Sequence, residues 1–131
     1  MRVMVDHNMS PRLARAINIL VEPLHRVEHL RDKFPTSTSD TEWIRQLSSE
    51  GEWVVFTLDN NIHRRPHELR ELNKSNLRVC FFLSAWSGKT PIERTYRILK
   101  RWDEIVELVE ASRPSTSLLI PIQGAIRRNV R

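Results

Sequence analysis

The chain has 131 residues, of which 40% are hydrophobic and 28% charged, and this balance excludes collagen-like, coiled-coil and fully disordered proteins. Its single cysteine, Cys80, excludes an internal disulfide framework and a cysteine-rich zinc site. The 21 basic and 16 acidic residues leave a net charge of +5, which favours RNA, DNA or an acidic protein as partner without choosing among them.

The N-terminal third of the chain predicts a strand, a helix and a weaker strand. Residues 2–6 form a short apolar run that ends in an acid, as a buried strand would. Ser10 is predicted to cap the following helix, with Pro11 at its first position and apolar residues at helical spacing as far as Leu20. A second, weaker strand is expected over residues 26–30.

The middle of the chain repeats this alternation. Ser39 and the acids after it open a second predicted helix, which Gly51 ends. Residues 52–58 are the clearest strand, because most of them favour β-structure. The polar and basic segment 60–74 is expected to hold one or two short helices, and residues 77–83 to form another apolar strand.

The C-terminal part is predicted to contain one long helix and a last strand. Thr90 caps the helix, which carries a regular apolar stripe to about Ala111 and is broken by Pro114. Residues 117–122 form the last strand, and Pro121 within it indicates a place at the edge of the sheet.

Alternation of strands and helices favours a parallel sheet that is covered by helices on both faces. We therefore expect an α/β fold with a central, mostly parallel sheet of about five strands. The predicted domain covers residues 1–123, and the basic residues 124–131 form a tail that we expect to be frayed.

Three acidic residues stand where a parallel sheet places its ligands. Asp6 closes the first predicted strand, Asp59 follows the third, and Asp40 lies where a loop enters a helix. Because the carboxyl ends of parallel strands share one edge of the sheet, we expect these carboxylates to converge. Converging carboxylates repel one another unless a cation neutralises them, and Mg²⁺ and Mn²⁺ prefer such oxygen ligands. With Arg64 and Arg65 to hold a nucleic-acid backbone, the pattern indicates a metal-dependent phosphodiesterase acting on RNA or DNA.

Most of these residues also have a purely structural interpretation. Glu42 fits a capping box at the start of its helix, and this role is favoured for it, whereas Asp40 suits a helix start and a metal ligand equally. Asp59 before two asparagines is a good turn signal, and the two arginines resemble an ordinary solvated face. Asp6 resists such an interpretation, because an unpaired acid buried behind an apolar strand costs on the order of several kcal/mol.

Residues 5–14, Val-Asp-His-Asn-Met-Ser-Pro-Arg-Leu-Ala, resemble the opening of PIN-like domains. The blocks that continue the likeness, in the family's order and spacing, are residues 29–32, 39–44, 54–59 and 62–72. The likeness covers roughly residues 2–85 and points to a subgroup related to VapC-type toxins. It implies a three-layer α/β PIN-like fold and a Mg²⁺- or Mn²⁺-dependent ribonuclease, commonly the toxin of a toxin–antitoxin pair.

Carried over residue by residue, the resemblance assigns the acidic metal site to Asp6, Asp40 and Asp59. Glu42 is then a supporting acid, and Asn8 is a polar position beside the first acid that orients a ligand or a water. Asn61 holds a supporting position in a stretch where related sequences often carry a further acid, and His7 stands where an acid is frequent. Fewer negative charges imply weaker metal binding, and one ion rather than two.

The first hypothesis is therefore an endoribonuclease that hydrolyses RNA phosphodiester bonds with a carboxylate-bound Mg²⁺ or Mn²⁺, while Arg64 and Arg65 grip flanking phosphates. The resemblance implies as partners RNA, a small antitoxin that blocks the acidic cleft, and a second copy of the chain contacted through the final helix. The alternative is a catalytically weak or inactive PIN-like scaffold that binds RNA or a protein, and a metal-dependent DNA nuclease is the third hypothesis. Because no apolar stretch could span a bilayer and no signal peptide is evident, we expect a cytoplasmic protein without a membrane partner.

Overall fold

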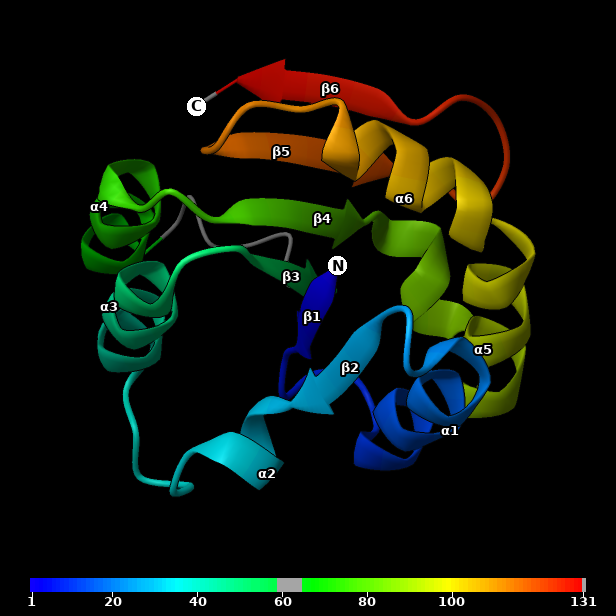
Figure 1. The fold of residues 1–131 in the computed structure, drawn as a ribbon, viewed down its shortest axis with the longest axis horizontal. Helices are drawn as coiled ribbons and strands as arrows, with labels where there is room; N and C mark the ends of the chain where they lie inside the picture. The colour runs from blue at the N-terminus through cyan, green and yellow to red at the C-terminus, as the bar shows by residue number, and fades with distance from the viewer. Residues whose placement is uncertain (59–64, 131) are drawn as a thin grey trace.

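The computed structural model describes residues 1–58 and 65–130 and shows a sheet with helices on both of its faces (Figure 1). The strands are β1 (Arg2–Val5), β2 (Arg26–His29), β3 (Trp53–Thr57), β4 (Arg78–Phe82), β5 (Thr116–Ile120) and β6 (Arg127–Val130). The helices are α1 (Pro11–Val21), α2 (Leu30–Lys33), α3 (Asp40–Glu50), α4 (Pro66–Lys74), α5 (Pro91–Lys100) and α6 (Trp102–Glu110), with a 3-10 helix, η2, over Ser84–Gly88.

Within the described ranges, these strands form one sheet in the order β2-β1-β3-β4-β5-β6. All neighbouring pairs from β2 to β5 are parallel, and β6 pairs antiparallel with β5. The predicted α/β fold with a mostly parallel sheet and helices on both faces is therefore confirmed. Strand β1 lies between β2 and β3. The chain therefore passes from β1 to β2 on one side of it and then crosses back to place β3 on the other side. Such a reversal of strand order is where open parallel sheets bind their ligands.

Alternating strand residues form two cores, one on each face of the sheet. On one face, Val5, Phe56 and Phe82 pack with residues of α1, α5 and α6. On the other face, Met4 and Val55 pack with residues of α2, α3 and α4. Figure 1 shows the two groups of helices on opposite sides of the sheet, which gives the three layers. The period of two along each strand produces this division, because successive side chains point to opposite faces.

Short-range hydrogen bonds begin three of the helices where the sequence predicts. The hydroxyl of Ser10 accepts from the N–H of Arg12 at 3.1 Å, and the hydroxyl of Ser39 accepts from the N–H of Glu42 at 3.2 Å. Thr90 does the same at the start of α5. Each cap satisfies an N–H group that has no partner within the helix, so local chemistry sets these helix starts.

The C-terminal part differs from the prediction in two ways. The single long helix that was expected from Thr90 to Ala111 is divided into α5 and α6 at Arg101. The guanidinium of Arg101 donates to the carbonyls of Pro121 at 2.9 Å and Gly124 at 2.7 Å, which ties this turn to the loop after β5. These partners are distant in sequence, so the apolar periodicity of the helix could not reveal the break.

The basic segment that was expected to be a frayed tail instead forms strand β6. Its register pairs Leu119 with Arg127 and Thr116 with Val130. Strand β6, not β5, is therefore the edge of the sheet, which corrects the edge position inferred from Pro121. Charged residues such as Arg127 and Arg128 are common on edge strands, where they discourage pairing with another chain.

Candidate active site

Asp6 lies at the carboxyl end of β1, at the point where the strand order reverses. Its N–H donates to the carbonyl of Phe56 at 2.9 Å, so its backbone continues the pairing of β1 with β3. One carboxylate oxygen, Oδ1, accepts from the N–H of His7 at 2.7 Å. The other, Oδ2, accepts from the hydroxyl of Thr57 at 2.8 Å. Both oxygens are therefore oriented by donors from the ends of β1 and β3.

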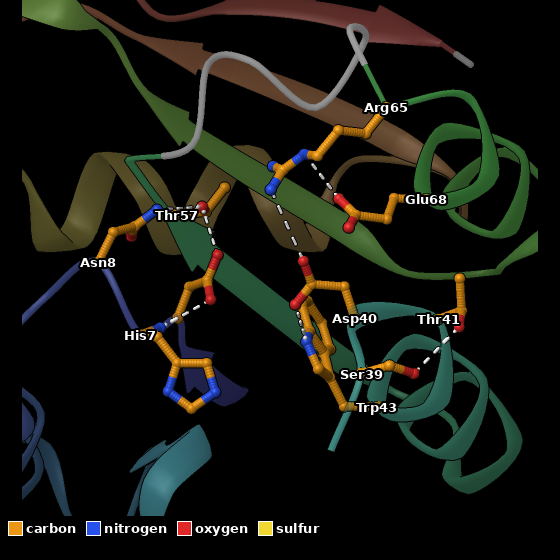
Figure 2. A network of polar contacts seen from close by, with 10 residues as sticks. His7, Asn8, Ser39, Asp40, Thr41, Trp43, Thr57, Arg65 and Glu68 are labelled. Carbon is orange, nitrogen blue, oxygen red and sulfur yellow. Dashed lines mark hydrogen bonds and ion pairs between the residues drawn. The ribbon is translucent and has the colours of Figure 1, made fainter. Parts of the chain in front are cut away.

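Asn8 holds the Thr57 hydroxyl in place (Figure 2). Its Nδ2 donates to Thr57 Oγ1 at 3.3 Å, and its Oδ1 accepts from the N–H of Leu58 at 3.0 Å. The hydroxyl thus accepts from Asn8 and donates to Asp6, which directs its proton to the carboxylate. The resemblance predicts that Asn8 orients a ligand or a water. In the structure Asn8 contacts Thr57, and Thr57 in turn contacts the carboxylate of Asp6.

Asp40 is the first residue of α3 and follows the cap residue Ser39. Its Oδ1 accepts from the indole N–H of the buried Trp43 at 2.8 Å. Its Oδ2 lies 3.8 Å from Nη1 of Arg65. Asp40 therefore sits in the first helical turn, as the capping interpretation requires, and its carboxylate also faces Arg65, which lies outside that helix. The two interpretations left open by the sequence are compatible in one residue.

Asp6 and Asp40 line the same small cavity. Its volume is about 20 Å³, and Trp43 and Thr57 also line it. Among the described residues, the apolar part of the lining consists of Val55, Leu72, Val79 and Phe81. A cavity needs roughly 10–15 Å³ to hold one water molecule, so this one suits a single water or a single ion. A nucleotide would have to bind outside it, at the edge of the sheet.

Glu68, in the first turn of α4, lies near these two acids and was not among the predicted site residues. Asp6, Asp40 and Glu68 together form the acid cluster. Oε2 of Glu68 lies 2.8 Å from Nε of Arg65. Burial raises the pKa of Glu68, the neighbouring carboxylate of Asp40 raises it further, and the charge of Asp6 adds to this effect. Glu68 therefore faces the two predicted acids. In the sequence, Glu68 is an ordinary acid in the first turn of a helix that begins with a proline, and such an acid is explained by the helix dipole alone.

The same crowding acts on Asp6. Burial raises the pKa of Asp6, and the negative charge of Asp40 raises it further, whereas the hydrogen bonds from Thr57 and His7 oppose the rise. Carboxylates with raised pKa values are carboxylates whose negative charge is poorly compensated. A cation beside these side chains would compensate the negative charge of both Asp6 and Glu68.

The donor chemistry fits a magnesium or manganese ion. The groups that meet here are carboxylates, which these hard cations prefer, and Mg²⁺ commonly uses one or two carboxylates together with several waters. Asp6 and Asp40 supply that number. Among residues 1–58 and 65–130, no group of three or more His, Cys, Asp or Glu side chains is placed to hold a metal ion.

The remaining predicted residues fall in three places. Glu42 is exposed, and it lines a separate cavity of about 310 Å³ beside Lys33 and Gln46, so the structure does not bring it to Asp6 and Asp40. Arg65 lies beside Asp40 and Glu68. The predicted site residues Asp59, Asn61 and Arg64 lie outside the described residues, and their roles stay predictions.

Within the part of the chain that the structure describes, no helix has both the length and the apolar character needed to cross a membrane. A family model described as PIN-like domain matches residues 1–85, which include Asp6, Asp40 and Glu68. Neither the curated proteins nor the solved structures contain a match to this chain.

Proposed function

The chain belongs to the PIN-like domain family, whose fold is of the nuclease type, and on this premise we propose that it is a metal-dependent endoribonuclease. We further propose that it is the toxin of a type II toxin–antitoxin pair, in the subgroup related to VapC-type toxins. The observation that carries the nuclease proposal is the meeting of Asp6 and Asp40 at one cavity. They come from β1 and α3, and a parallel sheet binds ligands at this reversal of strand order.

In this proposal Asp6, Asp40 and Asp59 hold one Mg²⁺ or Mn²⁺. When bound, the ion supplies charge stabilisation at the scissile phosphate and lowers the pKa of an attacking water. The other side chains position the acids. Thr57 and Asn8 fix the direction of the Asp6 carboxylate, and the indole of Trp43 fixes that of Asp40.

The side chains around the acids limit the access of water to them. The apolar side chains around the cavity, among them Val55 and Phe81, leave room for about one water beside the carboxylates. Electrostatic interactions are stronger where little water is present, so the site suits the stabilisation of charge on a phosphoryl group. Arg64 and Arg65 contact the phosphates that flank the scissile bond.

The proposed protein partners are a small antitoxin that covers the acidic cleft and a second copy of the chain. The family membership supports the first. For the homodimer, the support is an apolar groove of about 660 Å³ between α1 and α5. Ile92 and Tyr96 of α5 border it and are 83% and 57% exposed, and an exposed apolar patch beside a groove suits contact with a protein partner.

The second candidate function is a PIN-like scaffold of weak or absent activity that binds RNA or a protein. The observation that favours it is the ion pair of Arg65 with Asp40, since an acid that already faces an internal cation has less need of a metal. The two candidates differ in whether cleavage occurs at all.

The test is cleavage of a panel of structured and unstructured RNAs, and of single-stranded DNA, with Mn²⁺, with Mg²⁺ and with EDTA. We compare the wild type with Asp6→Asn and Asp59→Asn. The matched control is Asp32→Asn, because Asp32 pairs with Arg15 on the surface and lies outside the acid cluster. The proposal expects metal-dependent RNA cleavage that is lost in the first two variants and retained in the control.

Other outcomes separate the hypotheses. Cleavage of DNA but not RNA identifies a DNA nuclease. A folded wild type that cleaves nothing and gains no thermal stability from metal is the scaffold. Cleavage that persists in EDTA, or that Asp6→Asn retains, rejects the carboxylate-metal site. For the toxin role, expression of the wild type should arrest bacterial growth and Asp6→Asn should not.

A further inference from the structure

Arg65 lies between two carboxylates of the acid cluster (Figure 2). Its Nε is 2.8 Å from Oε2 of Glu68, three residues along α4, and its Nη1 is 3.8 Å from Oδ2 of Asp40. The side chains of Asp40 and Glu68 are 32% and 20% exposed, so solvent only partly screens these ion pairs. One guanidinium therefore compensates charge on acids from two different helices.

The two contacts differ in length. Both contacts are ion pairs, and the pair with Glu68 is the closer one, at 2.8 Å against 3.8 Å for Asp40. Asp40 Oδ1 accepts the indole N–H of Trp43, whereas Oδ2 faces the Arg65 guanidinium. A metal ion that binds Oδ2 would therefore compete with the guanidinium for this oxygen.

We propose that the guanidinium of Arg65 competes with the metal ion for the carboxylate of Asp40. When the metal ion displaces it from Asp40, the guanidinium stays paired with Glu68. This inference rests on the proposed function, because it describes how the same site is regulated. The longer contact with Asp40 is the one that exchanges, and the closer ion pair with Glu68 keeps the displaced guanidinium beside the cavity.

This competition predicts that the affinity for metal rises when the charge of Arg65 is removed. Without the guanidinium, Asp40 Oδ2 loses the ion pair with Arg65, so a divalent ion no longer has to displace that positive charge. A partly exposed ion pair contributes modestly, so the apparent Kd for Mn²⁺ should fall by about twofold to fivefold when Arg65 loses its charge.

The test is titration of the whole chain with Mn²⁺, followed by calorimetry and by the metal-induced rise in Tm. The variants are Arg65→Gln, which removes the charge, and Arg65→Lys, which keeps it. Arg45→Gln is the matched control, because Arg45 makes a comparable pair with Glu71 that also joins α3 to α4 but is not part of the acid cluster. The expected result is tighter Mn²⁺ binding by Arg65→Gln alone.

Unchanged or weaker Mn²⁺ binding by a folded Arg65→Gln, beside a wild type that binds, overturns this inference and leaves the proposed metal site intact. Tighter binding by Arg45→Gln to the same degree also overturns it, because the effect would then be one of net charge. If neither the wild type nor Arg65→Gln binds Mn²⁺, both the inference and the proposed metal site fail. Binding by Arg65→Gln but not by the wild type supports the competition directly.

Discussion

The hydroxyl of Thr57 donates to Oδ2 of Asp6 at 2.8 Å and so joins the carboxyl ends of β1 and β3. Thr57 is buried and is the last residue of its strand, and Asn8 donates to the same hydroxyl from the other side. The proton of Thr57 is therefore committed to the carboxylate. This arrangement lowers the pKa of an acid that burial would otherwise raise further.

Thr57→Val should weaken metal binding. The variant keeps the shape of the side chain but removes the donor, so the pKa of Asp6 rises further and the carboxylate is less firmly oriented. Loss of one hydrogen bond to a charged group predicts a roughly tenfold increase in the Kd for Mn²⁺, measured by calorimetry at neutral pH. Thr57→Ser retains the hydroxyl and should bind like the wild type. Equal affinities of the valine variant and the wild type would exclude a positioning role for Thr57.

Trp43 should report metal binding by its fluorescence. Its indole N–H lies 2.8 Å from Asp40 Oδ1, so an ion on Asp40 changes the electrostatic field at the ring. We expect Mg²⁺ to change the tryptophan emission of the wild type and of Trp53→Phe, because Trp53 begins β3 at the opposite end of the strand. Trp43→Phe should lose the change. A signal that survives this substitution would place the ion away from Asp40.

Glu50 should make stability depend on pH in the acid range. A hydrogen bond from Gln46, followed by contacts with Trp53 and Lys33, lowers the pKa of Glu50 from 4.5 to about 2. Because the folded state favours the carboxylate, the stabilisation is present above pH 4.5 and is lost as the pH falls toward 2.

Glu50→Gln should accordingly lower the free energy of unfolding at pH 7. Since the side chain is partly exposed, solvent screening limits the loss to roughly 0.5–1 kcal/mol. Urea denaturation of both proteins at several pH values should show the difference shrinking below pH 4.5. A difference that stays constant down to pH 2 would mean that the substitution acts through packing instead.

Deletion of residues 124–131 should reduce stability without changing the metal site. The deletion removes the pairing of β6 with β5 and the contact of Arg101 with the Gly124 carbonyl. A loss of 1–2 kcal/mol would lower the Tm by roughly 3–8 °C. The Kd for Mn²⁺ should be unchanged, because Asp6 directly follows β1 and Asp40 begins α3, neither of which is part of the deleted segment. An unaltered Tm would show that β6 contributes little to the fold.

The sequence by itself determined the elements whose signals are local. Ser10 and Ser39 begin their helices through hydrogen bonds to residues two and three positions ahead, so nearby sequence is enough to predict them. The alternation of strands and helices in turn leaves few alternatives to a parallel sheet. Because the carboxyl ends of its strands share one edge, the meeting of Asp6 and Asp40 could also be predicted.

Only the tertiary structure decided which further side chains join these acids. Thr57 reaches Asp6 because β1 and β3 pair side by side, although the two residues are 51 positions apart. Glu68 and Arg65 reach Asp40 because α4 packs beside α3 on the same face of the sheet. Strand β6 likewise forms because β5 offers an unpaired edge. Such contacts depend on how separate elements pack, and no local pattern of residue types encodes that packing.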